Sequence, residues 1–370
     1  MSQHPDLRPE SAMPENQCNV DGPLTFTYKE VDGISVLLDV YLPPDDVDQQ
    51  FTGQAIQYHP AVVYFHGGGL TVGNRRSWFP TWLKSRLSAR GIIFISADYR
   101  LIPPGTGYDV LADVKDAIAF VAGDLNVQLD QELAHLGSDS RFRIDPTSIG
   151  VAGTSSGGFC AYLCAIYAVP KPKVVLSLYG MGGDLLTDQY LAPKAQSFLR
   201  GREMLDPAQF SEYIHPTSGS PLAYHPQSYH IPGYPANPRM LISRLYLQLG
   251  VALDYITGQH EPSLSVTLRK AIHTEDPFDE ALISDHKIIF PQFNVTSDWP
   301  ATYLVHGTSD TAVLLRESRN LHSLLLKAGV EVVLEELPGR EHSFDYQPGA
   351  ELEHKGSFDD MVQFLYRHLT

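Results

Sequence analysis

The residues from Val151 to Gly158, Val-Ala-Gly-Thr-Ser-Ser-Gly-Gly, follow a short apolar run and precede an apolar segment with helical spacing. Within them, Gly153, Ser155 and Gly157 fit the pattern G-x-S-x-G. A serine at the tip of a sharp strand-to-helix turn has a strained backbone, and side chains two residues before and after it would collide with the crossing chain. Glycine at both places removes that clash. The motif therefore predicts such a turn, with Ser155 as its nucleophile.

Ser156 is the alternative nucleophile in the same stretch. As the tip residue it would be flanked by Thr154 and Gly158, and a β-branched side chain fits the first of these places badly. Ser155 is therefore preferred. The motif fixes only three residues, and a Gly- and Ser-rich turn before a helix would also produce it, so the rest of the chain has to supply the structural context.

The composition excludes several classes of partner. The chain has 370 residues, 43% of them hydrophobic, which suffices for one large α/β domain or two ordinary ones. Its 27 Lys and Arg against 43 Asp and Glu give a formal charge of −16 without a basic cluster, so we expect no nucleic acid or anionic lipid as partner. We see neither a secretory leader nor a run of roughly 18 apolar residues, and so expect no membrane span and a cytoplasmic location.

The cysteines give no sign of a metal or a disulfide framework. Cys18, Cys160 and Cys164 are odd in number, and no Cys/His set has the spacing of a zinc site. Cys160 and Cys164 lie four apart in a predicted helix and are expected to be buried small side chains. The sequence therefore predicts no metal and no cofactor, with a small molecule as ligand. Nothing in it predicts an oligomeric state.

Strands and helices alternate along most of the chain. Asp32-Gly33 lies between β-rich runs and predicts a hairpin of residues 25–31 and 35–42. Apolar runs predict buried strands at 61–65, 91–97, 148–152, 174–178, 301–305 and 331–337. Helical spacing predicts helices at 77–89 with Ser77 as N-cap, and at 108–122, 157–168, 312–328 and 357–369. This order indicates an α/β fold with a mainly parallel sheet and helices on both faces.

Two further segments follow predicted strands. His66-Gly67-Gly68-Gly69 follows the strand at 61–65, and consecutive glycines let backbone N–H groups approach a ligand and bind an oxyanion. Asp98 and Arg100 flank a tyrosine after the strand at 91–97, and we interpret them as a structural network that braces neighbouring loops. The working residues of parallel sheets gather at the carboxyl ends of the strands, so the glycine loop and Ser155 should share one edge.

The alternation breaks between residues 182 and 300. This insert is rich in Pro, Tyr and His and contains one long amphipathic stretch, residues 240–256. We expect it to form a helical cap over the active edge, with residues 1–22 as an N-terminal arm or part of the cap. Residues 23–181 and 301–370 would form the core. The histidines of the insert lack metal-ligand spacing.

A possible catalytic triad is spread over three strand ends. Ser155, Asp310 and His342 each lie just past a predicted strand, in the chain order expected for α/β-hydrolases. Asp298 and Asp345 are competing acids, but Asp298 precedes its strand and Asp345 follows the histidine. His306 is a competing base, although its place at a strand end suits apolar packing better. The pattern therefore predicts Ser155, Asp310 and His342 as the catalytic residues.

Several motifs of the sequence together resemble the hormone-sensitive-lipase-like esterases among the α/β-hydrolases. They are the HGGG loop, the DYRL segment at 98–101, the G-x-S-x-G elbow, the HGTSD loop at 306–310 and the late histidine, His342. The DYRLIPP segment at 98–104 and the elbow are also similar to those of fungal hydrolases encoded beside biosynthetic genes. The resemblance implies an oxyanion hole formed by Gly68, Gly69 and the backbone N–H of Ser156. Thr154 and Ser156 replace the family's Asp and Ala, and Thr154 would rearrange contacts behind the nucleophile.

The function predicted is that of a serine hydrolase which cleaves carboxylic esters of small, apolar molecules through an acyl-serine. The same triad can also serve an acyltransferase or a lactone-forming, product-releasing enzyme of a biosynthetic pathway, which differs in whether water is excluded. A non-catalytic binding protein on this fold and a cyclase that uses the pocket as a shaped cavity both remain open as well.

Overall fold

The computed structural model describes residues 22–44, 57–136, 142–217, 219–223, 225, 229–231, 234–274 and 276–370. The predicted arm at residues 1–22 lies outside this set apart from its last residue, as does Cys18. The other two cysteines are free and buried, as expected.

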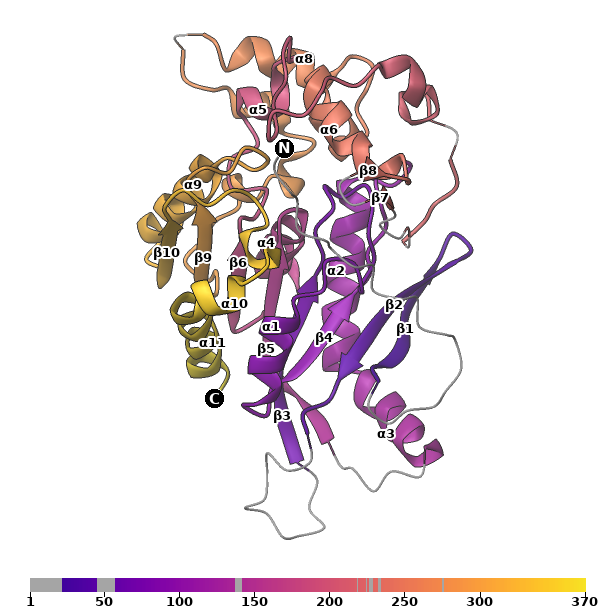
Figure 1. Cartoon of the computed structure of the whole chain (residues 1–370), viewed down its shortest axis with the longest axis vertical. Coiled ribbons are helices and arrows are strands. Elements are labelled where there is room, and N and C mark those ends of the chain that lie inside the picture. The colour runs from indigo at the N-terminus through magenta and orange to yellow at the C-terminus, as the bar shows by residue number, and fades with distance from the viewer. Residues whose placement is uncertain are drawn as a thin grey trace, which may run out of the picture.

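The central sheet has eight strands in the order β1-β2-β4-β3-β5-β6-β9-β10 (Figure 1). The first two strands form the predicted hairpin, whose turn residues Asp32 and Gly33 both have positive φ, as a two-residue hairpin turn requires. From β4 onwards neighbouring strands are parallel. The strand bounds are β1 Leu24–Val31, β2 Ile34–Tyr41, β3 Gln57–Phe65, β4 Ile93–Ala97, β5 Phe142–Thr154, β6 Val174–Leu178, β9 Ala301–Gly307 and β10 Val332–Leu337.

Helices pack on both faces of the sheet, so the predicted α/β architecture is confirmed. Helices α2, α4 and α9 contribute to the apolar cluster on one face, and α1 and α11 to the cluster on the other. The helix α3 was not predicted. The bounds of these helices are α1 Thr81–Ser88, α2 Gly107–Ala122, α3 Leu125–His135, α4 Ser156–Tyr167, α9 Leu315–Lys327 and α11 Lys355–Leu369, and α10 is the single turn Ala350–Glu353.

The predicted start of α1 at Ser77 is wrong. The helix begins at Thr81, directly after Pro80. The residue before a proline is disfavoured in the helical region, so Phe79 cannot continue a helix into Pro80. The Ser77 hydroxyl instead accepts a hydrogen bond from the backbone N–H of Asn74 and stabilises the preceding turn.

The insert also differs from its prediction. The stretch predicted as one amphipathic unit is two helices, α6 Arg239–Leu249 and α7 Ala252–Thr257. They are separated at Gly250, whose φ of 66° ends α6 in the left-handed conformation. The remaining elements of the insert are α5 Asp188–Leu191, β7 Tyr229–Ile231, β8 Tyr234–Pro235, α8 Leu264–Ala271 and short 3-10 turns. Helices α5, α6 and α8 gather at one end of the molecule (Figure 1).

The charged residues after β4 brace loops, as predicted. The Asp98 carboxylate accepts hydrogen bonds from the backbone N–H and the guanidinium of Arg75. The Arg100 guanidinium pairs with Asp113 on α2. Asp98 and Arg100 therefore bind different partners and tie the segment after the glycine loop and helix α2 to the end of β4.

Candidate active site

Ser155 lies at the junction of β5 and α4 with φ 54° and ψ −122°, a combination rarely adopted by a residue with a side chain. The glycines on either side make this turn possible. A Cβ on Gly153 would lie 2.0 Å from the Gly157 carbonyl oxygen, and a Cβ on Gly157 would lie 2.0 Å from the Phe65 carbonyl oxygen. The elbow's own backbone therefore leaves no room for a side chain at Gly153, and the end of β3 leaves none at Gly157.

The structure brings the three predicted catalytic residues together. The His342 Nε2 atom lies 2.9 Å from the Ser155 Oγ atom. The His342 Nδ1 atom lies 2.7 Å from one carboxylate oxygen of Asp310. These contacts join the loops after β5, β9 and β10, which are far apart in the chain. The arrangement is a continuous hydrogen-bonded chain from the carboxylate to the hydroxyl.

Asp310 is held in its charged form. Burial favours the neutral carboxyl, but the adjacent His342 and His306 outweigh burial and keep the pKa of Asp310 well below its usual range. Its other oxygen accepts hydrogen bonds from the backbone N–H groups of Ala312 and Val313, at 2.9 and 3.0 Å. These bonds also explain why α9 starts only at Leu315, three residues later than predicted.

The competing acids lie in other networks. Asp298 is exposed and forms an ion pair with Lys171. Asp345 is buried and accepts hydrogen bonds from the Tyr179 hydroxyl and the Trp82 indole N–H, at 2.5 and 3.2 Å. Burial raises the pKa of Asp345 to about 6. Asp345 therefore positions Tyr179, whose ring packs edge-on against His342 with centroids 4.5 Å apart.

The prediction of an apolar packing role for His306 is wrong. Its ring is fully buried but hydrogen-bonded on both sides, through Nδ1 to the Ser318 hydroxyl at 2.7 Å and through Nε2 to the Val313 carbonyl at 2.9 Å. The same Nε2 atom lies 3.2 Å from the carboxylate oxygen of Asp310 that faces His342. The sequence placed His306 correctly at the strand end but contained no sign of these partners.

The glycine loop lies directly against Ser155. A Cβ on Gly67 would be 3.3 Å from the Ser155 Cβ atom, and Gly68 and Gly69 have φ of 112° and 65°. The backbone N–H groups of Gly68, Gly69 and Ser156 donate to no acceptor within the described residues. Gly67, Gly68 and Gly69 line the same cavity as Ser155, so the glycine loop forms part of its wall, and Ser156 directly follows Ser155 in the chain.

Two supports of the loop were missed in the sequence. The Tyr99 hydroxyl donates to the His66 carbonyl at 2.9 Å, and the two rings stack with centroids 4.4 Å apart. On the other side, Thr154 shares a hydrogen bond with the Tyr64 hydroxyl at 2.8 Å. A tyrosine within or just after an apolar strand looks like a core residue in a sequence, so the pattern gave no signal for either contact.

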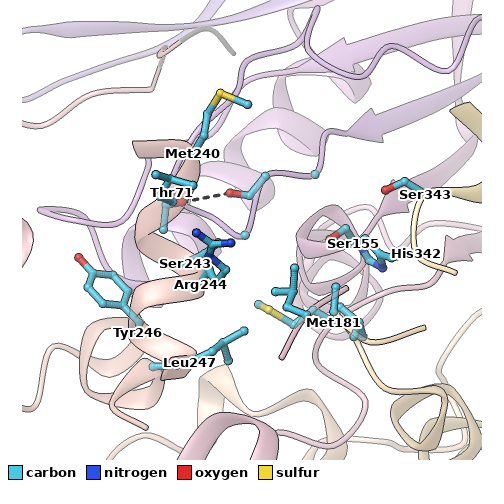
Figure 2. Close-up of a pocket in the computed structure, with 18 of the residues that line it drawn as sticks. Thr71, Ser155, Met181, Met240, Ser243, Arg244, Tyr246, Leu247, His342 and Ser343 are labelled. Atoms are coloured by element: carbon cyan, nitrogen blue, oxygen red, sulfur yellow. Dashed lines mark hydrogen bonds between the residues drawn. The ribbon is translucent and has the colours of Figure 1, made fainter. Parts of the chain in front are cut away.

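A cavity of about 280 Å³ opens in front of Ser155. Its walls come from both parts of the chain, because the core supplies the glycine loop, Ser155 and His342 while α6 and α7 of the insert supply the opposite side. In Figure 2, Met240, Ser243, Arg244 and Leu247 follow one another along α6 on that side. None of these insert residues was predicted, because pocket contacts of a helix far away in the chain depend on the packing of the insert.

The buried carboxyl of Glu317 contacts Tyr190, a residue of the cavity wall. Glu317 of α9 is fully buried, accepts a hydrogen bond from the Gly182 N–H at 2.7 Å, and lies 2.5 Å from the hydroxyl of Tyr190, which lines the cavity. Burial raises the pKa of Glu317 to about 8. Glu317 therefore links α9 to the first residues of the insert in a partly neutral form at physiological pH.

We expect Gly157→Ala to lower the rate of Ser155 acylation by at least about 100-fold, because the added methyl would displace the elbow from the glycine loop and misplace the nucleophile. The rate is measured as burst kinetics with an activated ester. Gly356→Ala in α11 is the matched control, because no atom lies within 4 Å of its added Cβ. Equal rates for Gly157→Ala and the control would contradict the crowding described for the elbow.

The buried Glu317 predicts a pH dependence of stability. Its pKa is raised from 4.5, the value of an exposed glutamate, to about 8 in the folded chain. Its contribution to the free energy of unfolding is therefore complete below pH 4.5 and is lost as the pH rises through 8. We expect the thermal midpoint to fall between pH 5 and pH 8 by more in the wild type than in Glu317→Gln. Glu280→Gln, on the exposed surface, should retain the wild-type profile, and the account fails if the three profiles are parallel.

The comparisons with known proteins agree with the fold. A family model described as alpha/beta hydrolase fold matches residues 62–228. An esterase of Thermogutta terrifontis superposes with a TM-score of 0.53 at 18% identity, covering 94% of this chain and 92% of that chain. A protein of unknown function from Staphylococcus aureus superposes with a TM-score of 0.59 at 17% identity, covering 94% and 100%. Among the described residues, no helix is both long and apolar enough to cross a membrane.

Two of the relatives that the chain matches come from fungi. A Phoma protein named "Probable carboxylesterase M8" is 30% identical over 159 residues, which cover 42% of this chain and 46% of that protein. A non-reducing polyketide synthase of Penicillium brevicompactum is 26% identical over 363 residues, which cover 93% of this chain and 15% of the synthase. The chain thus spans less than half the length of each of these two relatives. It has the α/β-hydrolase fold and resembles esterases of that fold, as its motifs predicted.

Proposed function

We propose that the chain is a serine hydrolase that cleaves carboxylic esters of small molecules through an acyl-serine intermediate. The observation that carries the proposal is the hydrogen-bonded chain Ser155–His342–Asp310 at the wall of the cavity, with Oγ···Nε2 and Nδ1···Oδ2 distances of 2.9 and 2.7 Å. Neither a metal nor a cofactor is required for this chemistry. The cavity volume of about 280 Å³ favours a small substrate.

The acylation step begins at Ser155. With Nδ1–H donated to Asp310, the Nε2 atom of His342 is unprotonated and accepts the proton of the serine hydroxyl as Oγ attacks the ester carbonyl. Asp310 stays ionised and stabilises the imidazolium that forms. His342 then transfers the proton to the departing alcohol, and the acyl group remains on Ser155.

Hydrogen-bond donors have to stabilise the negative charge that develops on the carbonyl oxygen. We assign this role to the backbone N–H groups of Gly68, Gly69 and Ser156, which lie around Ser155 and donate to no acceptor among the described residues. Loss of one such donor typically lowers the rate by about 100-fold to 1000-fold. In the second half of the reaction, His342 takes a proton from water as the water attacks the acyl carbonyl, and the same N–H groups bind the oxyanion. His342 then returns the proton to Ser155 as the acid is released.

The insert at residues 182–300 acts in this proposal as a cap over a core formed by residues 23–181 and 301–370. Residues of α6 and α7, together with Leu199 and Arg202 of the preceding loop, line the cavity opposite Ser155. The apolar lining, which includes Met240, Leu247 and Ile256, is suited to an apolar portion of the substrate. The cap would thereby select the ester and limit access of water.

A second candidate is acyl transfer to an alcohol, including lactone formation that releases a biosynthetic product. It is favoured by the match of nearly the whole chain to one part of a polyketide synthase. It uses the same triad and differs only in the nucleophile that attacks the acyl-serine. With an added alcohol, an ester product in excess over the acid would favour transfer, whereas acid alone would favour hydrolysis.

We expect the wild type to hydrolyse p-nitrophenyl acetate or butyrate through an acyl-serine, and Ser155→Ala to lose turnover by at least about 10⁴-fold because the nucleophile is absent. The measurement is p-nitrophenol release together with the intact mass of the acylated chain. Ser35→Ala on the exposed face of the hairpin is the control and should behave as wild type. Full activity of Ser155→Ala on these esters would contradict the proposal, because their hydrolysis would then not depend on Ser155.

A further inference from the structure

The charge of the cavity is opposite to that of the chain. The chain as a whole carries a formal charge of −16, yet the charged residues that line the cavity, apart from the titratable His342, are Arg200, Arg202 and Arg244, with no Asp or Glu among the described lining residues. A low-dielectric cleft lined by one sign of charge concentrates ligands of the opposite sign. The charged side chains on the cavity wall are therefore positive, which favours an anionic ligand, and Arg200 is the one of the three that pairs with a carboxylate among the described residues, Glu341 at 3.9 Å.

Arg244 is the deepest of these arginines. It is half-buried on α6, whereas Arg200 and Arg202 are exposed. Among the described residues, its Nε atom is buried without a hydrogen-bond partner and its guanidinium forms no ion pair. A buried donor of a charged group normally has an acceptor, and leaving it without one is costly. The Arg244 side chain thus has an unused hydrogen-bonding capacity inside the cavity.

Two arginines that are more deeply buried than Arg244 show how such a group is normally satisfied. Arg239 begins the same helix, and its guanidinium donates to the carbonyl oxygens of Thr71, Ile102 and Pro103. Arg75 pairs with Asp39 and Asp98. Arg244 has no comparable partner in the part of the chain that the structure describes. Burial and the nearby Arg202 lower its pKa, and the exposed Glu203 only partly opposes them, which indicates an incompletely compensated positive charge.

Arg244 lines the same cavity as Ser155 and His342. Ser243, its neighbour on α6, packs against the glycine loop so closely that a Cβ on Gly69 would lie 2.5 Å from the Ser243 Cβ atom. Figure 2 shows Ser243 and Arg244 on the α6 side of the cavity and Ser155 with His342 on the other side. A molecule that fits a cavity of about 280 Å³ with its ester carbonyl at Ser155 can therefore also reach α6.

We infer that the substrate is an ester that carries a carboxylate, and that Arg244 binds this carboxylate while Arg202 attracts it at the mouth of the cavity. The inference rests on the proposed ester hydrolysis and specifies its substrate class. The guanidinium donates its free N–H groups to the carboxylate oxygens, and the apolar residues of α6 and α7 contact the rest of the molecule. No bond of the carboxylate is made or broken in this step, which only orients the ester.

The test compares esters that differ only in an anionic group. One pair is mono-(4-nitrophenyl) glutarate and 4-nitrophenyl butyrate, with the carboxylate on the acyl side. The other is 4-acetoxybenzoate and 4-acetoxybenzamide, with the carboxylate on the alcohol side. In at least one pair, we expect the wild type to favour the anionic ester by about 10-fold to 100-fold in kcat/KM, as a charge-assisted hydrogen bond allows.

The variants identify the residue responsible. Arg244→Met keeps much of the apolar stem and should abolish the preference for the anionic ester, chiefly through KM, whereas Arg244→Lys should retain part of it. Arg319→Met is the matched control, since it removes the same charge from an exposed position on α9 that pairs with Glu336, and should keep the wild-type ratio. The ratio of two substrates in one preparation is unaffected by a loss of folded protein.

The outcomes separate this inference from the proposed function. Turnover of the neutral esters through Ser155 without any preference of the wild type for an anionic ester would overturn the inference and leave the hydrolase. An equal preference in Arg244→Met and the wild type would also overturn the assignment to Arg244. Absence of turnover and of acylation for all four esters would contradict the proposed function and, with it, the substrate class.

Discussion

The carbonyl oxygen of Phe65 at the end of β3 lies where a side chain on Gly157 would stand, and this contact fixes the geometry of the site. It forces the chain after β5 into a sharp turn, on which Ser155 takes a positive φ. Phe65 also leads directly into the glycine loop, so the contact between the end of β3 and the elbow after β5 positions both Ser155 and the neighbouring N–H groups. Asp310 and His342 follow β9 and β10, whose parallel order brings their ends to the same edge.

Burial and charge act together around this edge. Asp310 remains ionised because His342, His306 and two backbone N–H groups compensate its burial. Glu317, equally buried but without a cation, has its pKa raised to about 8 and serves to hold the start of the insert. Arg244 on the opposite wall has neither an anion nor a carbonyl as partner among the described residues. Arg244, the half-buried charge in the site without a recognised partner among the described residues, thus belongs to the insert and not to the core.

The sequence could predict those parts that depend on local pattern. Asp32-Gly33 specified a hairpin, apolar runs specified the parallel strands, and Gly153 and Gly157 specified the elbow, since each depends on residues adjacent in the chain. Ser77 failed as an N-cap because Pro80 excludes the helix before it, and residues 240–256 formed two helices because Gly250 takes a left-handed conformation. The partners of His306 and the pocket position of Arg244 depend on tertiary packing, which no local pattern encodes.

The most direct test of the account is where a fluorophosphonate reacts with the native chain. The elbow, His342 and the glycine loop together should make Ser155 the one serine that is activated. We therefore predict one equivalent of phosphonate per chain by intact mass, located on Ser155 by tandem mass spectrometry of the proteolytic peptide. The absence of an adduct under conditions that label other serine hydrolases, or an adduct on Ser156, would contradict the account.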